Sequence, residues 1–174
     1  MIKALLLALS LPLLLGAQPT WEARLPDIIF PAEVLANDGK KIDVAQLAKE
    51  QRVVVVTLKA TWCEVCQQQL VRIKQHLDQL EHCSVTFLVL SPGSTDQLDA
   101  IQKRTGFPYP FIADRDLNIG ATMQLVLDNK KQQLMPAIFI LNPDRSVGWI
   151  QFGRNATRFG ESQLLAEIDC GDWI

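Results

Sequence analysis

Apolar residues along the chain form two kinds of segment in turn. One is a short β-branched run, and the other is a longer stretch with apolar residues at helical spacing. Residues 53–59, Val-Val-Val-Val-Thr-Leu-Lys, form such a run and predict a buried strand. The stretch after it carries apolar side chains at steps of four and three, the period of a helix with one buried face. These are Cys66, Leu70, Ile73, Leu77 and Leu80.

The strand–helix pattern then repeats along the chain. Residues 84–90 predict a second buried strand, and Ser94 or Thr95 can cap a helix that ends near Gly106. Residues 107–110, with two prolines, predict an extended connection into residues 111–113. Residues 116–125 predict a short helix, and the polar residues 128–133 predict a loop.

Both ends of the chain add smaller elements. Short strands are predicted at 28–30 and 34–36, followed by an Asn-Asp-Gly turn and a helix at 45–49. Near the other end, strands at 135–141 and 147–152 read as a hairpin, and a helix closes the chain at 160–168. This order predicts an α/β fold whose mixed sheet has a parallel centre and an antiparallel hairpin at one side.

Composition allows one domain and a leader. The 174 residues are 48% apolar, enough for a sizeable core, and a formal charge of −2 without a basic run disfavours nucleic acid. Lys3, the apolar stretch 4–15 and small residues at 16–17 predict a signal peptide over residues 1–17. An uncleaved anchor is the alternative, because Leu15 is large for the third position before the cut. Residues 18–174 would then form a domain that works outside the cytoplasm.

Two cysteines lie where the first strand passes into its helix, with Cys63 at the helix start and Cys66 one turn on. Unpaired backbone N–H groups and the helix dipole both favour an anion there, so the Cys63 thiol should ionise easily. Cys66 is within reach to attack a mixed disulfide formed at Cys63. The pair therefore predicts a dithiol–disulfide redox site.

A zinc site is the first alternative for these cysteines. Structural zinc usually takes two spaced pairs of ligands, and the remaining candidates are scattered. They are His76, His82, Cys83 and Cys170. We therefore expect no metal and no other cofactor.

Two motifs together resemble the thioredoxin superfamily. A strand leads into Ala-Thr-Trp-Cys-x-x-Cys at residues 60–66, and Met-Pro-x-x-Phe-Ile-Leu at 135–141 precedes Asn-Pro-Asp. With the insert between Ser91 and Asp116, the chain resembles the extracytoplasmic TlpA-like and AhpC/TSA-redoxin branch over residues 24–170. The resemblance implies a thioredoxin-like fold, a mixed central sheet flanked by helices on both faces.

The resemblance also assigns roles to single residues. It makes Cys63 the exposed nucleophile, Cys66 the resolving thiol, and Pro136 a cis-proline that faces the dithiol. The Met135 backbone would pair with a substrate strand, beside Trp62. The expected activity is thiol–disulfide exchange, with protein disulfide or dithiol substrates, a redox partner and a periplasmic location.

Four residues depart from the family pattern. Thr57 stands where relatives often have a buried acid or amide, and Lys59 replaces a common aromatic. Glu64-Val65 separate the cysteines where many relatives have a proline. Glu64 and Val65 should tune the redox couple, because a carboxylate beside Cys63 disfavours its thiolate and opposes the helix terminus.

A thiol peroxidase and a non-catalytic binding module are the alternative functions. Peroxiredoxins need Pro-x-x-x-Thr-x-x-Cys, but Val56 and Ala60 occupy those places before Cys63, and Lys59 and Cys63 occupy them before Cys66. A purely structural disulfide across so short a loop would stabilise the fold little.

Cys83 and Cys170 remain. In a thioredoxin-like arrangement each follows the end of a helix on the same face of the sheet, so a bridge is possible if their Cα atoms lie within about 7 Å. Two free thiols are the alternative.

Overall fold

A five-stranded mixed sheet forms the centre of the computed structural model, which describes residues 28–153 and 161–168. The strands lie in the order β5-β4-β3-β8-β9. They are β3 (Arg52–Thr57), β4 (Val85–Ser91), β5 (Phe111–Ala113), β8 (Ala137–Leu141) and β9 (Val147–Phe152). β3, β4 and β5 are parallel, whereas β8 is antiparallel to both β3 and β9. The predicted parallel centre with a hairpin at one side is confirmed.

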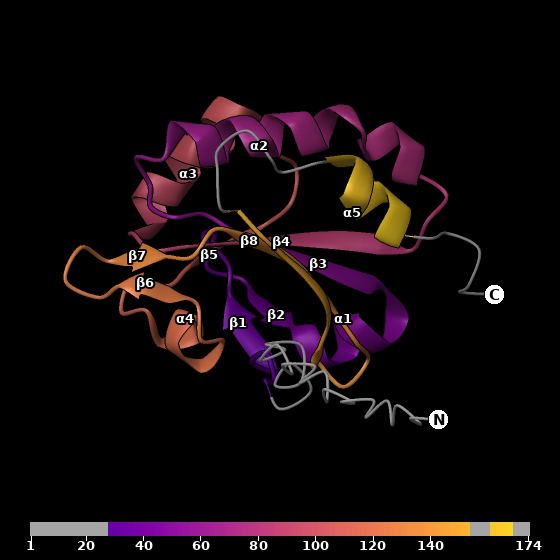
Figure 1. Cartoon of the computed structure of the whole chain (residues 1–174), viewed down its shortest axis with the longest axis horizontal. Coiled ribbons are helices and arrows are strands. Elements are labelled where there is room, and N and C mark those ends of the chain that lie inside the picture. Colours follow the sequence, from indigo (N-terminus) through magenta and orange to yellow (C-terminus); the bar gives the residue numbers. More distant parts are fainter. Residues whose placement is uncertain (1–27, 154–160, 169–174) are drawn as a thin grey trace, which may run out of the picture.

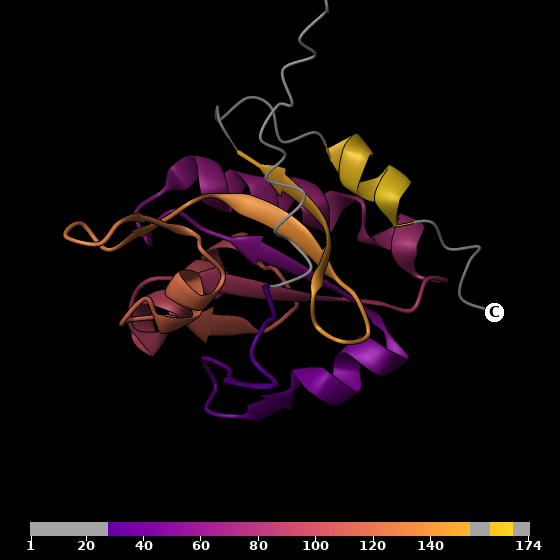
Figure 2. The ribbon, with the colours of Figure 1, turned by 60° about the horizontal axis from the view of Figure 1, so that its bottom comes forward.

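Helices cover both faces of this sheet (Figure 1). One face carries α2 (Glu64–Gln75), α3 (Thr95–Thr105) and α5 (Glu161–Glu167). The other carries α1 (Val44–Glu50) and α4 (Asn118–Thr122). Figure 2 shows α2 and α5 on the side of the sheet opposite α1. The thioredoxin-like fold class is therefore confirmed.

The valine run explains why both faces are covered. Side chains alternate along a strand, so Val53 and Val55 pack on the α1 side while Val54 and Val56 pack on the α2 side. All four valines are fully buried. Such a central strand can only exist between two layers of helices, which is why a continuous apolar run predicted it correctly.

Two segments differ from the sequence prediction in the strands they form. Residues 28–30 make only one bridge, between Ile29 and Ser146, and the first ribbon instead pairs β1 (Glu33–Leu35) with β2 (Lys41–Asp43). A second ribbon, β6 (Val126–Asp128) and β7 (Gln133–Leu134), flanks the predicted loop at 128–133, whose central residues 129–132 form the connecting turn. Backbone pairing and the burial of β7 stabilise this ribbon, whose strands of three and two residues are too short to show an apolar pattern.

Two helices are shorter than predicted. α2 ends at Gln75, and the apolar stripe continues through the 3₁₀ turn η2 (Leu77–Leu80), where Leu80 is still buried. α4 begins only at Asn118, because Leu117 before it has a left-handed backbone with φ of 57°. α3 begins and ends as predicted, with a Ser94 capping box and a left-handed Gly106.

Strand direction gathers three loops at one edge of the sheet. Thr57, the last residue of β3, lies opposite Leu90 near the end of β4 and opposite Ala137 at the start of antiparallel β8. The loop after β3, the loop after β4 and the segment before β8 therefore meet. No helix among residues 28–153 and 161–168 is long and apolar enough to cross a membrane.

Candidate functional site: a disulfide at the start of a helix

A disulfide joins Cys63 and Cys66, whose Cα atoms are 5.3 Å apart. Cys63 is the N-cap of α2, and its Sγ accepts a hydrogen bond from the Cys66 backbone N–H at 3.4 Å. Cys63 is partly exposed, whereas Cys66 is 5% exposed and belongs to the core beneath α2. The two sulfurs thus differ in access although they lie in one helical turn.

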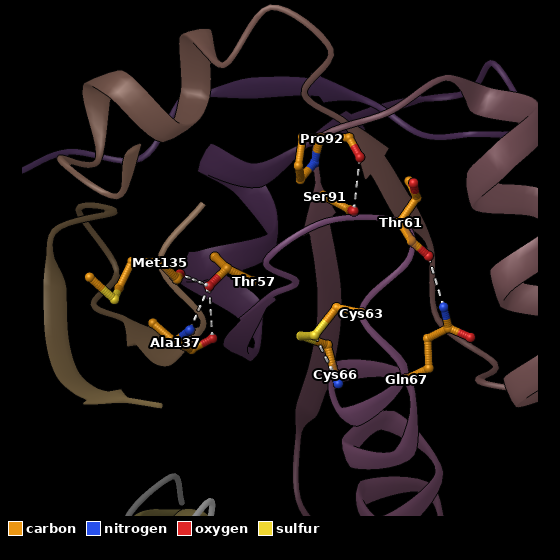
Figure 3. Close-up of a disulfide and its surroundings, with 9 residues drawn as sticks. All are labelled: Thr57, Thr61, Cys63, Cys66, Gln67, Ser91, Pro92, Met135 and Ala137. Atoms are coloured by element: carbon orange, nitrogen blue, oxygen red, sulfur yellow. Dashed lines mark hydrogen bonds between the residues drawn. A yellow bond between two sulfur atoms is a disulfide. The ribbon is translucent and has the colours of Figure 1, made fainter. Parts of the chain in front are cut away.

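Three contacts hold the turn before Cys63, and Figure 3 shows the one between Gln67 and Thr61. The Cys63 N–H donates to the Ala60 carbonyl at 3.1 Å, closing a turn with Thr61 and Trp62 at its centre. The Gln67 amide Nε2 donates to the Thr61 carbonyl at 2.8 Å. Gly93, after β4, packs so closely on the Thr61 side chain that a Cβ there would lie 2.4 Å from Thr61 Cγ2.

Trp62 and the two residues between the cysteines lie around the disulfide. The Trp62 side chain is 62% exposed, and Lys59 Nζ lies 5.6 Å from its ring centroid. Glu64 is exposed in the first turn of α2, and Val65 is half-buried. The carboxylate therefore stands at the end of the helix where it stabilises the helix itself but opposes a thiolate.

The prediction of a cis-proline at residue 136 is wrong. The described residues contain no cis peptide bond, so the Met135–Pro136 bond is trans. Trans is the more stable isomer of an X–Pro bond, and the local hydrogen bonds here are satisfied with it. The Pro136 carbonyl accepts from the Gly153 N–H at 2.8 Å.

The Met135 backbone is already paired within the protein, which corrects its predicted role as a partner for a substrate strand. Its N–H donates to the Leu125 carbonyl at 2.6 Å. Its carbonyl accepts from the Thr57 hydroxyl at 2.7 Å, and the same hydroxyl accepts from the Ala137 N–H at 2.6 Å. In the view of Figure 3 this group lies on the other side of the disulfide from Thr61 and Gln67.

Thr57 therefore has a structural role in place of the missing acid. Its side chain is fully buried and ties the end of β3 to residues 135–137. Leaving a buried donor or acceptor unpaired costs about 1–3 kcal/mol, so the hydroxyl stabilises this junction.

The remaining metal and cysteine candidates lie away from this arrangement. The described part of the chain holds no group of three or more His, Cys, Asp or Glu residues that could bind a metal ion. Cys83, in the loop before β4, is not a free thiol. Its predicted partner Cys170 lies outside the described residues, as does the predicted leader at 1–17.

Sequence reasoning missed Gln67, Gly93 and Arg104. The Arg104 Nη1 donates to Gln67 Oε1 at 3.0 Å, so α3 contacts the turn before Cys63 through one glutamine. Helical periodicity could have shown that Gln67 lies near the buried face of α2. It could not show which partners would meet its amide.

The comparison with protein families identifies one family. The family model described as the AhpC/TSA family matches residues 22–150. A curated relative is the thioredoxin-like protein AAED1, chloroplastic, of Arabidopsis thaliana, 25% identical over 88 residues. That match covers 51% of this chain but only 36% of the plant protein.

Similar solved structures have the same fold at low sequence identity. A bacterioferritin comigratory protein of Xanthomonas campestris aligns with a TM-score of 0.70 at 15% identity, over 83% of this chain and 94% of its own. A reduced 2-Cys peroxiredoxin of Plasmodium vivax aligns with a TM-score of 0.67 at 18% identity, over 81% and 92%. With the family model matching well over half of the sequence, the chain belongs to the AhpC/TSA family, within the thioredoxin superfamily.

Proposed function

We propose that this protein is a thiol–disulfide oxidoreductase that uses the Cys63–Cys66 couple outside the cytoplasm. One observation carries the proposal: the disulfide closes inside the first turn of α2, with Cys63 partly exposed and Cys66 buried. One sulfur is open to a substrate and the other is placed to resolve the adduct. The AhpC/TSA family supports thiol redox chemistry in general.

The exchange in the reducing direction has two balanced steps. The Cys63 thiolate attacks one sulfur of a substrate disulfide, forming a mixed disulfide and releasing the other sulfur as a thiolate, which takes a proton from water. Cys66 loses its proton to solvent and attacks Cys63 Sγ as a thiolate. The Cys63–Cys66 disulfide forms, and the second substrate sulfur leaves as a thiolate that takes a proton from solvent. The reverse sequence oxidises a dithiol.

Two features of α2 act on the first step in opposite directions. The Cys66 N–H already points at Cys63 Sγ, and the positive end of the helix favours a negative sulfur. The Glu64 carboxylate, next in the chain, opposes it. Glu64 and Val65 are the residues we propose to set the potential of the couple.

The partners follow from this chemistry. We propose protein disulfides or dithiols as substrates, with the exposed Trp62 as part of the contact surface, and a separate redox protein that restores the couple. A periplasmic location is proposed from the leader pattern at residues 1–17. Membrane attachment follows only if that leader is not cleaved.

A thiol peroxidase is the second candidate. The Met135 backbone, which would pair with an extended protein substrate, is occupied by Leu125 and Thr57. A small peroxide needs no such pairing: it would oxidise the Cys63 thiolate to a sulfenic acid with release of an alcohol or water. Cys66 would then form the disulfide with loss of water, and an external dithiol would reduce it. Against this candidate, Ala60 and Val56 stand in place of the threonine and proline of the peroxide site.

Parallel turnover assays separate the two candidates. The purified domain is supplied with a dithiol reductant and either insulin or hydrogen peroxide, and insulin precipitation or peroxide loss is followed. We expect insulin reduction that is lost in Cys63→Ser and little peroxide consumption. Fast peroxide consumption without insulin reduction would establish the peroxidase instead, and failure of both assays would support the binding module.

A further inference from the structure

Gln67 is a nearly buried polar residue whose side chain is hydrogen bonded to the turn before Cys63. It lies one helical turn beyond Cys63 on α2 and is 6% exposed. Both ends of its amide are paired: Nε2 donates to the Thr61 carbonyl at 2.8 Å, and Oε1 accepts from Arg104 Nη1 at 3.0 Å. A buried amide with both ends paired has one orientation.

The bond to Thr61 holds a peptide group that could otherwise turn. Thr61 and Trp62 are the central residues of the turn that Cys63 N–H closes on Ala60. The two common β-turn types differ chiefly by a flip of the peptide between their central residues, and the flipped type requires a positive φ at the second. Trp62 is not among the residues with positive φ. Gln67 therefore anchors the carbonyl of the unflipped turn.

Arg104 fixes which end of the amide faces Thr61. Its guanidinium can only donate, so Gln67 Oε1 faces α3 and Nε2 faces the turn. A donor charged in this way also polarises the amide and strengthens its second hydrogen bond. An open surface pocket of about 250 Å³ lined by Gln67, Arg104 and Glu64 lies beside this contact.

We propose that Gln67 is a positioning residue for Cys63: by holding the Thr61 carbonyl, it keeps the Cys63 sulfur in place at the start of α2, and Arg104 holds Gln67 in turn. The inference rests on the proposed role of the Cys63–Cys66 couple. It concerns the reduced protein, in which no disulfide to Cys66 holds Cys63 Sγ in place. A Cys63 thiolate that moves from this position loses the hydrogen bond from the Cys66 N–H, and Cys66 can no longer attack an adduct formed on it.

The test measures the reduced protein directly. The rate at which iodoacetamide alkylates Cys63 is followed against pH by mass spectrometry, in wild type and in Gln67→Met, which keeps the volume but not the hydrogen bonds. We expect the pH profile of the variant to move to higher pH. Below the midpoint its rate should fall about three- to tenfold, the size expected for one lost hydrogen bond. Gln68→Met, the same change at the exposed neighbour on α2, should match wild type.

Variants of Arg104 keep the test decisive even if Gln67→Met folds poorly. Arg104 is exposed, so Arg104→Ala should fold, yet it should shift the same profile in the same direction by a smaller amount. Arg104→Lys keeps a donor and should restore most of the wild-type behaviour. Wild-type profiles in both Gln67→Met and Arg104→Ala would overturn the inference, and so would a wild-type profile in Arg104→Ala if Gln67→Met does not fold.

The alkylation profile needs no physiological substrate, so it separates this inference from the proposed function. If wild-type Cys63 titrates like an ordinary cysteine, the activated thiol of the proposed function is wrong. If wild type is activated and the variants equal it, only the role of Gln67 is wrong. A change in unfolding free energy alone, with an unchanged profile, would show a purely structural role.

Discussion

Cys63 and Cys66 have different environments although they are only three positions apart in the sequence. Cys63 is the partly exposed N-cap of α2, and Cys66 faces the core with Leu70 and Ile73. A helix turns by about 100° per residue, so the third residue on returns to the same face but one turn deeper. The proposed roles of attacking and resolving thiol rest on that difference in depth.

Replacing Cys66 with serine should therefore trap substrates on Cys63. The first attack needs only Cys63, while release needs the second thiol. Mass spectrometry after incubation of the reduced Cys66→Ser protein with a disulfide-bonded substrate should find mixed disulfides at Cys63. The matched Cys63→Ser protein should form few. Adducts in Cys63→Ser but not in Cys66→Ser would reverse the two roles.

Thr57 offers a second test at a single residue. Thr57→Val keeps the shape but leaves the Met135 carbonyl and the Ala137 N–H without their buried partner. The free energy of unfolding should fall by about 1–3 kcal/mol, as measured by urea denaturation. Thr57→Ser keeps the hydroxyl and serves as the control. Equal stability of Thr57→Val and wild type would show that the hydroxyl is dispensable.

The sequence predicts the position of a residue well when that position depends on local contacts, and poorly when it depends on contacts distant in sequence. The position of Cys63 at a helix start depends on local pattern, and it was correct. The roles of Met135 and Pro136 came from the family resemblance, and the structure has a trans bond and an occupied backbone there. The partners of the Met135 backbone, Thr57 and Leu125, lie outside its own strand, so no local pattern reports them.

At the scale of elements, the loop between β4 and α3 packs against the turn before Cys63. Gly93 in this loop has φ of +136° and touches Thr61. A side chain there would meet both backbone strain and the Thr61 methyl group. The sequence Ser-Pro-Gly predicted the end of a strand but not the contact with residue 61.

Gly93→Ala should impair the site more than a comparable glycine change elsewhere. Gly39→Ala is the matched control, because Gly39 also has positive φ (+82°) but nothing lies within 4 Å of an added Cβ. Both variants should lose stability of about 1 kcal/mol from the backbone. Only Gly93→Ala should also slow insulin reduction, because it displaces the turn before Cys63. Equal insulin rates in the two variants would contradict this coupling.

Elements that bury a face were predicted correctly from their apolar pattern. Elements held mainly by backbone hydrogen bonds were missed. β3 is a continuous apolar run because both its faces are buried, and α2 and α3 show helical periodicity because each buries one face. The β6–β7 ribbon is short and its connection polar, so hydrogen bonds stabilise what no apolar pattern marks. The end of α2 at Gln75 was missed because the apolar stripe continues into η2.

At the scale of the whole molecule, α2 and α5 pack on the same face of the sheet (Figure 1). This is the arrangement from which a Cys83–Cys170 bridge was expected. Cys83 is not a free thiol, and Cys170 lies outside the described residues. The bridge stays a prediction.

Peptide mapping of non-reduced protein from an oxidising compartment should find Cys83 joined to Cys170. Such a bridge closes a long loop, and Cys170→Ser should lower the free energy of unfolding by on the order of 4 kcal/mol, less any strain. Cys63–Cys66 should be reduced first by added dithiol, since the other pair is expected to be structural. Alkylatable Cys83 and Cys170 in native protein would refute the bridge.

A redox titration of the Cys63–Cys66 couple tests the central claim most directly. The protein is equilibrated in glutathione buffers of graded ratio, quenched with acid, and the Cys63–Cys66 peptide is quantified as dithiol or disulfide by mass spectrometry. The account predicts one reversible two-electron transition within the range of thiol oxidoreductases, about −120 to −270 mV. A pair that stays oxidised below about −300 mV would be a structural disulfide and would contradict the account.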